Sequence, residues 1–254
     1  MKIVIFSGTT EGRELSYRLA EQGAEVVVSV ATEYGSEEQG RRPGITTLTG
    51  RLAVDGMKKL LSDAELCVDA THPYAVQVTR DLRAACGEAG IEYRRLIRRG
   101  SGRTEGSGIA VETAAEAAAL LADQPGNILL TTGAKELNHF QKLAPARLYP
   151  RILPTHEGLS ACEQLGIPHR NIIAMQGPFS QELNEAVIRQ YQITWLVTKD
   201  GGIPGGFPEK AQAAAATGTK LVVIRRPEET GETFEKILAH CIQKIQQTAK
   251  TSAL

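Results

Sequence analysis

Glycine and hydroxyl side chains follow the first apolar run of the chain, residues 2–6. The turn reads Gly8-Thr9-Thr10-Glu11-Gly12-Arg13. Such a turn between a strand and a helix can bind the pyrophosphate of a nucleotide, because the first helical N–H groups lack partners and carry partial positive charge. Glycine permits close approach of the phosphate, and we expect valine at Gly12 to crowd it. The hydroxyls and Arg13 can donate to phosphate, whereas Glu11 is expected to face a ribose or the backbone. Only the first glycine fits G-x-G-x-x-G, so a plain tight turn remains the alternative.

Polar side chains also follow the second apolar run, residues 25–30. Ser29 lies near its end, and Ala31, Thr32 and Glu33 come next. In a dinucleotide fold this end of the second strand meets the adenosine ribose. Ser29 and Thr32 can donate to a 2′-phosphate, while Glu33 can accept from a ribose diol. The residues therefore leave NADPH and NADH both open, with Ala31 expected beside the same ligand.

A histidine and a tyrosine follow the apolar run 66–69, in the segment Asp69-Ala70-Thr71-His72-Pro73-Tyr74-Ala75. Pro73 favours an extended His72 and can begin the next helix. Both side chains should then lie at the carboxyl edge of a parallel sheet, where open α/β sheets bind ligands. His72 is a candidate cofactor contact, and both side chains are candidates for a functional role at this edge. A purely structural histidine is the alternative.

The second half repeats this pattern of polar residues after apolar runs. Four glycines within residues 201–206 suit the close approach of a bulky ligand or a moving loop, and a flexible turn is the alternative. The candidate substrate-binding residues are Tyr74, Lys135, Gln176, Ser180, Lys199, Asp200 and Gly205.

Arginines cluster beside and within a glycine-rich segment. Arg94, Arg95, Arg98, Arg99 and Arg103 can bind the carboxylates of an anionic substrate, and Arg151 offers another cation in the second half. Such a run is more often a solvated face, and binding of substrate carboxylates is the alternative.

The elements that position these residues alternate along the chain. Apolar runs separated by helical spacing predict parallel strands joined by crossover helices, and their lack of polar alternation indicates sheets covered on both faces. We predict two Rossmann-like (flavodoxin-like) doubly wound α/β domains: 1–99 for a nucleotide and 109–254 mainly for a substrate. Residues 100–108 are the predicted linker, and the apolar stripe from Phe234 to Ile245 predicts a terminal helix in the second domain. The predicted strands are residues 2–6, 25–30, 45–48, 66–69, 91–93, 127–131, 147–153, 171–175, 194–198 and 220–224.

Composition excludes several functions. The 254 residues include 29 Lys plus Arg and 29 Asp plus Glu, so the basic excess typical of nucleic-acid binding is missing. No apolar run approaches the roughly 18 residues that cross a bilayer, so no membrane partner is expected. The four cysteines are widely spaced, which indicates a reducing compartment, and we expect a cytoplasmic protein. The histidine spacing predicts no dedicated metal site.

Six segments together resemble the family of precorrin-6A and cobalt-precorrin-6A reductases, over nearly the whole chain. They are residues 8–13, 31–35, 69–75, 132–135, 176–180, and Lys199-Asp200 with the glycines after it. The family usually has serine after Lys-Asp, whereas this chain has Gly201, so no hydroxyl is expected to act at that position.

The resemblance implies two Rossmann-like domains with the cofactor and the tetrapyrrole in a cleft between them. It further implies hydride transfer from NADPH or NADH to one carbon of a C=C bond in the macrocycle, with a proton added to the neighbouring carbon. The product would be precorrin-6B, in cobalamin biosynthesis, with hand-over to adjacent corrin-pathway enzymes. The proton donor stays open, since His72, Tyr74, Lys199 and water are all candidates. Two other functions remain: a methyltransferase using S-adenosylmethionine, and a non-catalytic tetrapyrrole-binding module.

Overall fold

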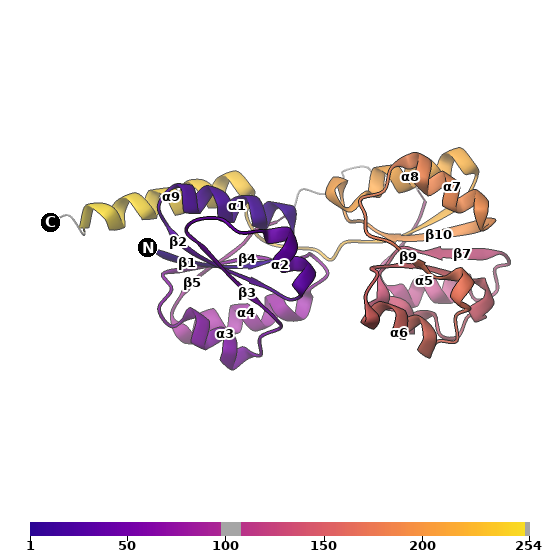
Figure 1. Cartoon of the computed structure of the whole chain (residues 1–254), viewed down its shortest axis with the longest axis horizontal. Coiled ribbons are helices and arrows are strands. Elements are labelled where there is room, and N and C mark those ends of the chain that lie inside the picture. Colours follow the sequence, from indigo (N-terminus) through magenta and orange to yellow (C-terminus); the bar gives the residue numbers. More distant parts are fainter. Residues whose placement is uncertain (98–107, 252–254) are drawn as a thin grey trace. The chain divides into compact units, whose positions relative to one another are not determined.

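The chain folds into two compact units. The computed structural model describes residues 1–97 and 108–251. Unit 1 comprises Met1–Arg98 with Glu228–Leu254, and unit 2 comprises Arg99–Pro227. Each unit is a parallel sheet with helices on both faces, which confirms the predicted fold class (Figure 1). The predicted linker, apart from Gly108, lies outside the described residues.

Unit 1 is built on a five-stranded sheet in the order β3-β2-β1-β4-β5, and every neighbouring pair is parallel. The chain winds outward from β1 in one direction and then returns to place β4 on its other side. The carboxyl ends of β1 and β4 are therefore the point where the winding reverses, which is where such sheets bind ligands. The strands are β1 (Lys2–Ser7), β2 (Glu25–Val30), β3 (Ile45–Thr49), β4 (Leu66–Ala70) and β5 (Glu92–Arg95).

Side chains of β1 alternate between two apolar layers of unit 1. Ile3 and Ile5 belong to the layer under α1 and α9, whereas Val4 and Phe6 face α3 and α4. A strand buried on both faces reads as a continuous apolar run, as the sequence of β1 does. Figure 1 shows α1 and α9 on one face of this sheet and α3 and α4 on the other. The helices are α1 (Thr10–Glu21), α2 (Glu33–Gln39), α3 (Val54–Leu61), α4 (Val76–Ala89) and α9 (Phe234–Thr251).

The terminal helix α9 packs on unit 1, not on the second domain as predicted from its place in the sequence. Ile237 and Cys241 are fully buried in the core layer of β1, β2 and α1. Before the helix, Glu232 bridges in parallel to Leu96 beyond β5. The apolar stripe correctly predicted a packed helix, but the stripe does not encode which sheet it covers.

Unit 2 contains a six-stranded sheet in the order β6-β11-β10-β7-β8-β9, again with parallel neighbours. Its winding reverses between β7 and β10. The strands are β6 (Ile109–Val111), β7 (Asn127–Leu130), β8 (Leu148–Ile152), β9 (Ile173–Ala174), β10 (Ile193–Lys199) and β11 (Lys220–Ile224).

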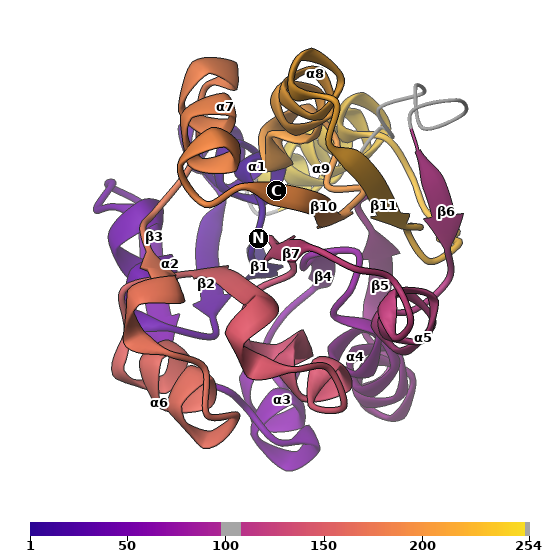
Figure 2. The same ribbon diagram turned by 90° about the vertical axis from the view of Figure 1, so that its right-hand side faces the viewer.

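Helices cover both faces of this second sheet (Figure 2). One face carries α7 and α8 over an apolar cluster that includes Leu129, Leu196 and Phe207. The other face carries α5, α6 and a 3-10 helix over Ala134–Phe140. The α-helices are α5 (Ala114–Leu121), α6 (His156–Gln164), α7 (Gln181–Gln190) and α8 (Phe207–Thr217), and shorter 3-10 helices span Pro145–Arg147, His169–Asn171 and Ile203–Gly205. Across residues 1–97 and 108–251, none of the helices combines the length and hydropathy of a bilayer-crossing segment.

Candidate functional site

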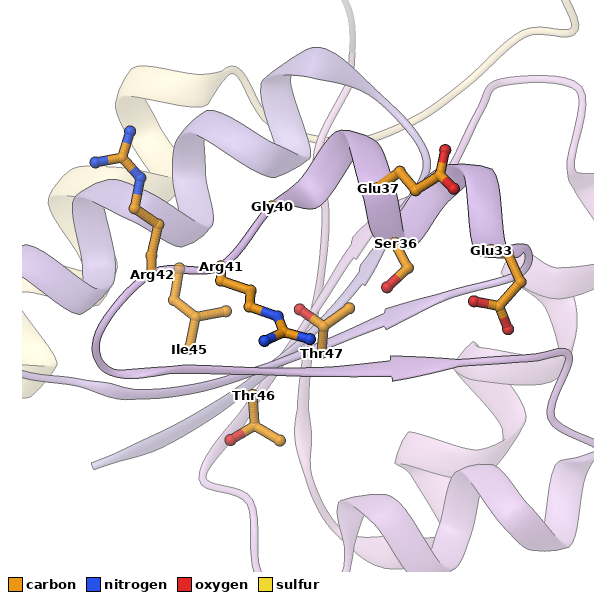
Figure 3. A pocket seen from close by; sticks show the side chains of 9 residues that line it. All are labelled: Glu33, Ser36, Glu37, Gly40, Arg41, Arg42, Ile45, Thr46 and Thr47. Carbon is orange, nitrogen blue, oxygen red and sulfur yellow. The ribbon is translucent and has the colours of Figure 1, made fainter.

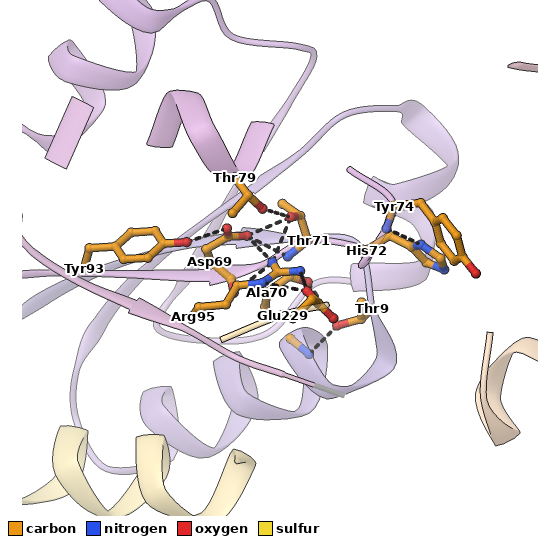
Figure 4. A network of polar contacts seen from close by, with 11 residues as sticks. Thr9, Asp69, Ala70, Thr71, His72, Tyr74, Thr79, Tyr93, Arg95 and Glu229 are labelled. Carbon is orange, nitrogen blue, oxygen red and sulfur yellow. Dashed lines mark hydrogen bonds and ion pairs between the residues drawn. The ribbon is translucent and has the colours of Figure 1, made fainter. Parts of the chain in front are cut away.

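The loops after β1 and β4 lie side by side at the reversal point of unit 1. A Cβ placed on Gly8 would lie 3.6 Å from the backbone nitrogen of His72. The Thr9 hydroxyl donates to the carbonyl of Ala70 at the end of β4, at 3.0 Å (Figure 4). Helix α1 starts directly afterwards at Thr10, so its N-terminal N–H groups face this edge. The structure thus brings together the predicted phosphate turn and the predicted His72 loop.

Thr9 and Gly12 of the turn stabilise the packing of α1, a role that the sequence did not indicate. The Thr9 hydroxyl accepts from the amide of Gly12 at 3.1 Å and so caps α1, besides its bond to Ala70. A Cβ on Gly12 would lie 2.7 Å from the Cβ of Ala70 and 2.9 Å from Oγ of Ser7. Gly12 therefore allows α1 to pack closely against β1 and β4. The expectation that valine at Gly12 acts by crowding a phosphate is superseded, since it would first collide with the protein.

Two of the remaining predicted cofactor residues, Arg13 and Thr32, contact α2. Arg13 binds Glu38, donating to its carboxylate at 2.8 Å and to its carbonyl at 2.9 Å. Thr32 caps α2 by accepting from the amide of Gly35, and Ser29 is buried. Ala31 is exposed after β2, and Glu11 lies in the first turn of α1. Arg13 and Thr32 thus tie α2 in place, a role that the sequence did not indicate because α2 itself was not predicted.

A cavity of about 690 Å³ opens between α2 and β3. Glu33 lines this cavity, but none of the other residues predicted to hold the cofactor does (Figure 3). It is lined by Glu33, Ser36, Glu37, Gly40, Arg41, Arg42, Ile45, Thr46 and Thr47.

His72 and Tyr74 contact each other in the loop after β4. Their rings stack with centroids 5.5 Å apart, and the amide of Tyr74 donates to Nδ1 of His72 at 3.4 Å. The amide of Ala75 donates to the His72 carbonyl at 2.8 Å, which closes a turn around the buried Pro73. Both candidate proton donors are therefore partly exposed at the edge where α1 begins.

A buried polar network lies beneath this loop (Figure 4). Asp69, fully buried, accepts from Nη1 of Arg95 at 2.6 Å and from the Tyr93 hydroxyl at 2.8 Å. Thr71 donates to the same carboxylate from its amide and its hydroxyl. Arg95 also binds Glu229, through Nε at 3.1 Å and through Nη2. Burial, followed by the nearby Asp69 charge, raises the pKa of Tyr93.

This network corrects the prediction for the arginine cluster. Arg95 is buried with Asp69 and Glu229, and Arg94 binds Glu92 and Glu232, so both hold unit 1 together instead of facing a substrate. Arg98, Arg99 and Arg103 lie outside the described residues. Asp69 was overlooked as a support for the His72 loop, although an acid inside an apolar strand was a visible signal.

In unit 2 the loops after β7 and β10 meet at the reversal point. Nζ of Lys199, at the end of β10, donates to the Glu136 carboxylate at 2.6 Å. Lys135 precedes Glu136 on the 3-10 helix that follows β7. The Asp200 carboxylate accepts from the amide of Gly202 at 3.3 Å and shapes the glycine-rich loop. The structure therefore brings Lys135, Lys199 and Asp200 to one edge, as predicted.

Gly201 suits this loop for a steric reason. A Cβ there would lie 3.2 Å from Cα of Gly205, so the two glycines approach each other closely. Gly202 and Gly206 have positive φ of 65° and 64°, which disfavours other residues. Glycine at 201 thus belongs to the packing of residues 201–206.

The loop after β9 carries the other predicted substrate residues. Gln176 precedes a cis peptide bond between Gly177 and Pro178, and Ser180 caps α7 by accepting from the amide of Leu183. Beside this loop, Arg151 of β8 is buried with its guanidinium 4.0 Å from the centroid of the Phe179 ring. The capping role of Ser180 was not predicted, because the start of α7 was not located in the sequence.

Two Rossmann-type parallel α/β units, each with polar residues gathered where its strand order reverses, define a class of two-domain ligand-binding α/β proteins. The model of the family described as precorrin-6x reductase CbiJ/CobK matches residues 2–242. The chain belongs to this family.

Individual relatives agree with this assignment. The chain is 35% identical to cobalt-precorrin-6A reductase of Priestia megaterium over 246 residues, covering 93% of this chain and 96% of the relative. It is 28% identical to precorrin-6A reductase of Rhodobacter capsulatus over 229 residues, covering 89% and 88%. A solved structure of CobK precorrin-6A reductase has a TM-score of 0.75 at 26% identity and covers 94% of this chain and 96% of that one.

Proposed function

We propose that this chain reduces a C=C bond of the precorrin-6A or cobalt-precorrin-6A macrocycle with NADPH or NADH, to give the dihydro product of cobalamin biosynthesis. The observation that carries the proposal is the family match along residues 2–242, supported by relatives named for this reaction. It disfavours a methyltransferase and a non-catalytic carrier, since those relatives are named as reductases.

Unit 1 is the proposed cofactor domain. Gly8 is exposed, the protein itself leaves room for a Cβ there, and α1 begins two residues later at the reversal point of the sheet. These features fit a pyrophosphate, whose charge the helix N-terminus stabilises. A nicotinamide cofactor bound there would supply the hydride. Gly8 and Thr10 would approach the pyrophosphate, whereas Thr9, Gly12, Arg13 and Thr32 support it by positioning α1 and α2.

Unit 2 is the proposed site of the macrocycle. Exposed apolar side chains follow its strands at the carboxyl edge: Leu153 after β8, Met175 after β9 and Ile203 after β10, the last with 72% of its surface exposed. Apolar surface beside cations suits a flat macrocycle that carries carboxylates. Gln176, Lys135 and Lys199 would contact its periphery.

A proton must reach the carbon next to the one that accepts the hydride. His72, Tyr74 and Lys199 remain the candidate donors, together with water. The stacked pair of His72 and Tyr74 lies beside the predicted cofactor turn, while Lys199 is held by Glu136 in unit 2. Replacing the proton donor should change the pH dependence of kcat. The variants His72→Asn, Tyr74→Phe and Lys199→Met therefore distinguish the three candidate side chains.

The test is anaerobic incubation of the whole chain with metal-free and with cobalt-loaded substrate, each with NADPH and with NADH. The expected result is loss of the reduced-nicotinamide absorbance together with a gain of two hydrogens in the tetrapyrrole by mass spectrometry. A parallel titration with S-adenosylmethionine serves as a control. Binding of the pigment without nicotinamide oxidation in all four mixtures would overturn the proposal.

A further inference from the structure

Two buried cations lie in unit 2, one on β8 and one on α8. Arg151 retains 6% of its surface and Lys210 retains 8%. Cations this buried are ordinarily paired with a carboxylate. Over residues 1–97 and 108–251 neither has one within ion-pair distance: Arg151 donates to the Asn184 amide oxygen at 2.8 Å, and Lys210 donates to the Gly205 carbonyl at 2.8 Å.

The surrounding residues hold Arg151 in a fixed position. Its guanidinium stacks on Phe179, and Asn184 is itself held because its amide group donates to the carbonyls of Ser180 at 2.8 Å and Phe179 at 3.4 Å. Only Nη1 of Arg151 hydrogen bonds to a described residue. A guanidinium has five N–H donors, so donors remain for a bidentate acceptor such as a carboxylate.

Lys210 is connected directly to the glycine-rich loop. Its ammonium group donates to the carbonyl of Gly205, in the loop of residues 201–206 that follows Lys199. Burial lowers the pKa of Arg151 to about 10. Burial and then repulsion from Arg151 lower the pKa of Lys210 to about 8, against the opposing effect of Glu209. Two cations that repel each other in a poorly solvated place are stabilised by an incoming anion.

We propose that the buried cations Arg151 and Lys210, which have no carboxylate partner among the described residues, bind carboxylate side chains of the macrocycle. This inference rests on the proposed function. The apolar side chains of Leu153, Met175 and Ile203 follow the strands of the same edge and suit the ring from which the carboxylates would extend. A phosphate group of NADPH or NADH is also an anion, and the experiment distinguishes it from a substrate carboxylate.

The experiment compares the whole wild-type chain with Lys210→Met and Arg151→Met. The dissociation constant for the substrate is measured by absorbance titration without nicotinamide, and that for NADPH and NADH without substrate. We expect the substrate constant to rise about 10- to 100-fold in each variant, the loss of a charge-assisted hydrogen bond, with nicotinamide affinity unchanged. Lys142→Met, which removes an exposed lysine of the same unit, should leave both constants unchanged.

Thermal unfolding provides a second readout. A lysine kept for structure should lower Tm when replaced, whereas Lys210→Met removes an uncompensated charge and should leave Tm unchanged or higher. If Arg151→Met does not fold, Lys210→Met decides the matter. Unchanged substrate affinity in a folded Lys210→Met overturns the proposal, and so does a selective loss of nicotinamide affinity. If wild type turns over and the variants bind substrate as wild type does, only the role of Arg151 and Lys210 is refuted. If wild type oxidises no nicotinamide, the reductase proposal itself is refuted.

Discussion

Gly8 and Gly12 lie four residues apart in one turn, yet their surroundings differ. A Cβ on Gly12 would come within 2.7 Å of Ala70, whereas a Cβ on Gly8 would have no neighbour closer than 3.6 Å. The first distance is a steric clash and the second is ordinary contact. Replacement of these two glycines by alanine therefore separates the packing of α1 from the binding of a ligand.

We expect Gly12→Ala to lower the free energy of unfolding by about 1–3 kcal/mol, the usual effect of overpacking. Gly8→Ala should leave it unchanged and instead weaken NADPH or NADH binding, because the new methyl group occupies space beside the pyrophosphate. Urea unfolding and nicotinamide titration of both variants are the measurements. Equal nicotinamide affinity in Gly8→Ala and wild type would contradict a phosphate at this turn.

Asp69 is the acceptor at the centre of the buried network of unit 1, with Arg95, Thr71 and Tyr93 as its donors. We expect Asp69→Asn to cost about 3–5 kcal/mol of the free energy of unfolding, because it removes one partner of a buried ion pair. Urea denaturation measures the change. Asp63→Asn is the matched control, since Asp63 forms an exposed pair with Lys2 and its loss should leave the midpoint unchanged. Equal midpoints for both variants would show that the network contributes no stability.

At the scale of elements, α9 and β5 are joined by charged side chains. The carboxylate of Glu92 in β5 pairs with Lys244 of α9 and with Arg94, and Nε2 of His240 lies 2.8 Å from it. Burial acts to raise the pKa of Glu92, but the hydrogen bonds from Lys244 and Arg94 outweigh it and lower the pKa to about 2. The ionised carboxylate is therefore part of what holds α9 on unit 1.

The sign of this shift gives a pH dependence. Because the folded-state pKa lies below the ordinary value of 4.5, the contribution of Glu92 is complete above that value and is lost as pH falls toward 2. We expect unit 1 to lose stability over this interval, and Glu92→Gln to reduce the slope. The free energy of unfolding measured between about pH 5 and pH 2 tests this. A variant with the slope of wild type would exclude Glu92 as a source of the acid sensitivity.

At the scale of the whole molecule, residues 228–254 return to complete the unit in which the chain began. Ile237 and Cys241 are fully buried in that unit. We expect a chain ending at Pro227 to lose amide protection throughout unit 1 while unit 2 keeps it, because only unit 1 loses part of its core. Hydrogen exchange with mass spectrometry measures this, and protection lost equally in both units would contradict the assignment of α9.

Most strands could be predicted from the sequence, because a parallel strand buried on both faces is a local apolar run. The observed β2 and β11 have the predicted bounds, while β6 was missed because Ile109–Val111 is short and follows a glycine-rich segment. The sequence also predicted that residues following the strands would lie together, because the carboxyl ends of parallel strands meet at one edge of a sheet. Lys199 and Glu136 are 63 positions apart in the chain and meet because β7 and β10 are adjacent.

What individual side chains do was decided by the tertiary structure. Arg95 was expected on a solvated face or at a substrate, but it is buried with Asp69. Thr9 and Gly12 support α1 within the turn predicted to bind phosphate. Arg151 was noted only as an available cation, and its burial without a carboxylate partner among the described residues became visible only when β8, α7 and α8 were placed together.

The sequence by itself determined the two parallel α/β units and the edges that carry their polar residues, because hydrophobic periodicity and turn composition are local properties of the chain. Only the tertiary structure decided that α9 covers the first sheet and which cations are already neutralised. Those outcomes depend on contacts between residues far apart in sequence, such as Arg95 with Glu229 and Ile237 with the core of unit 1, and no local pattern encodes such contacts.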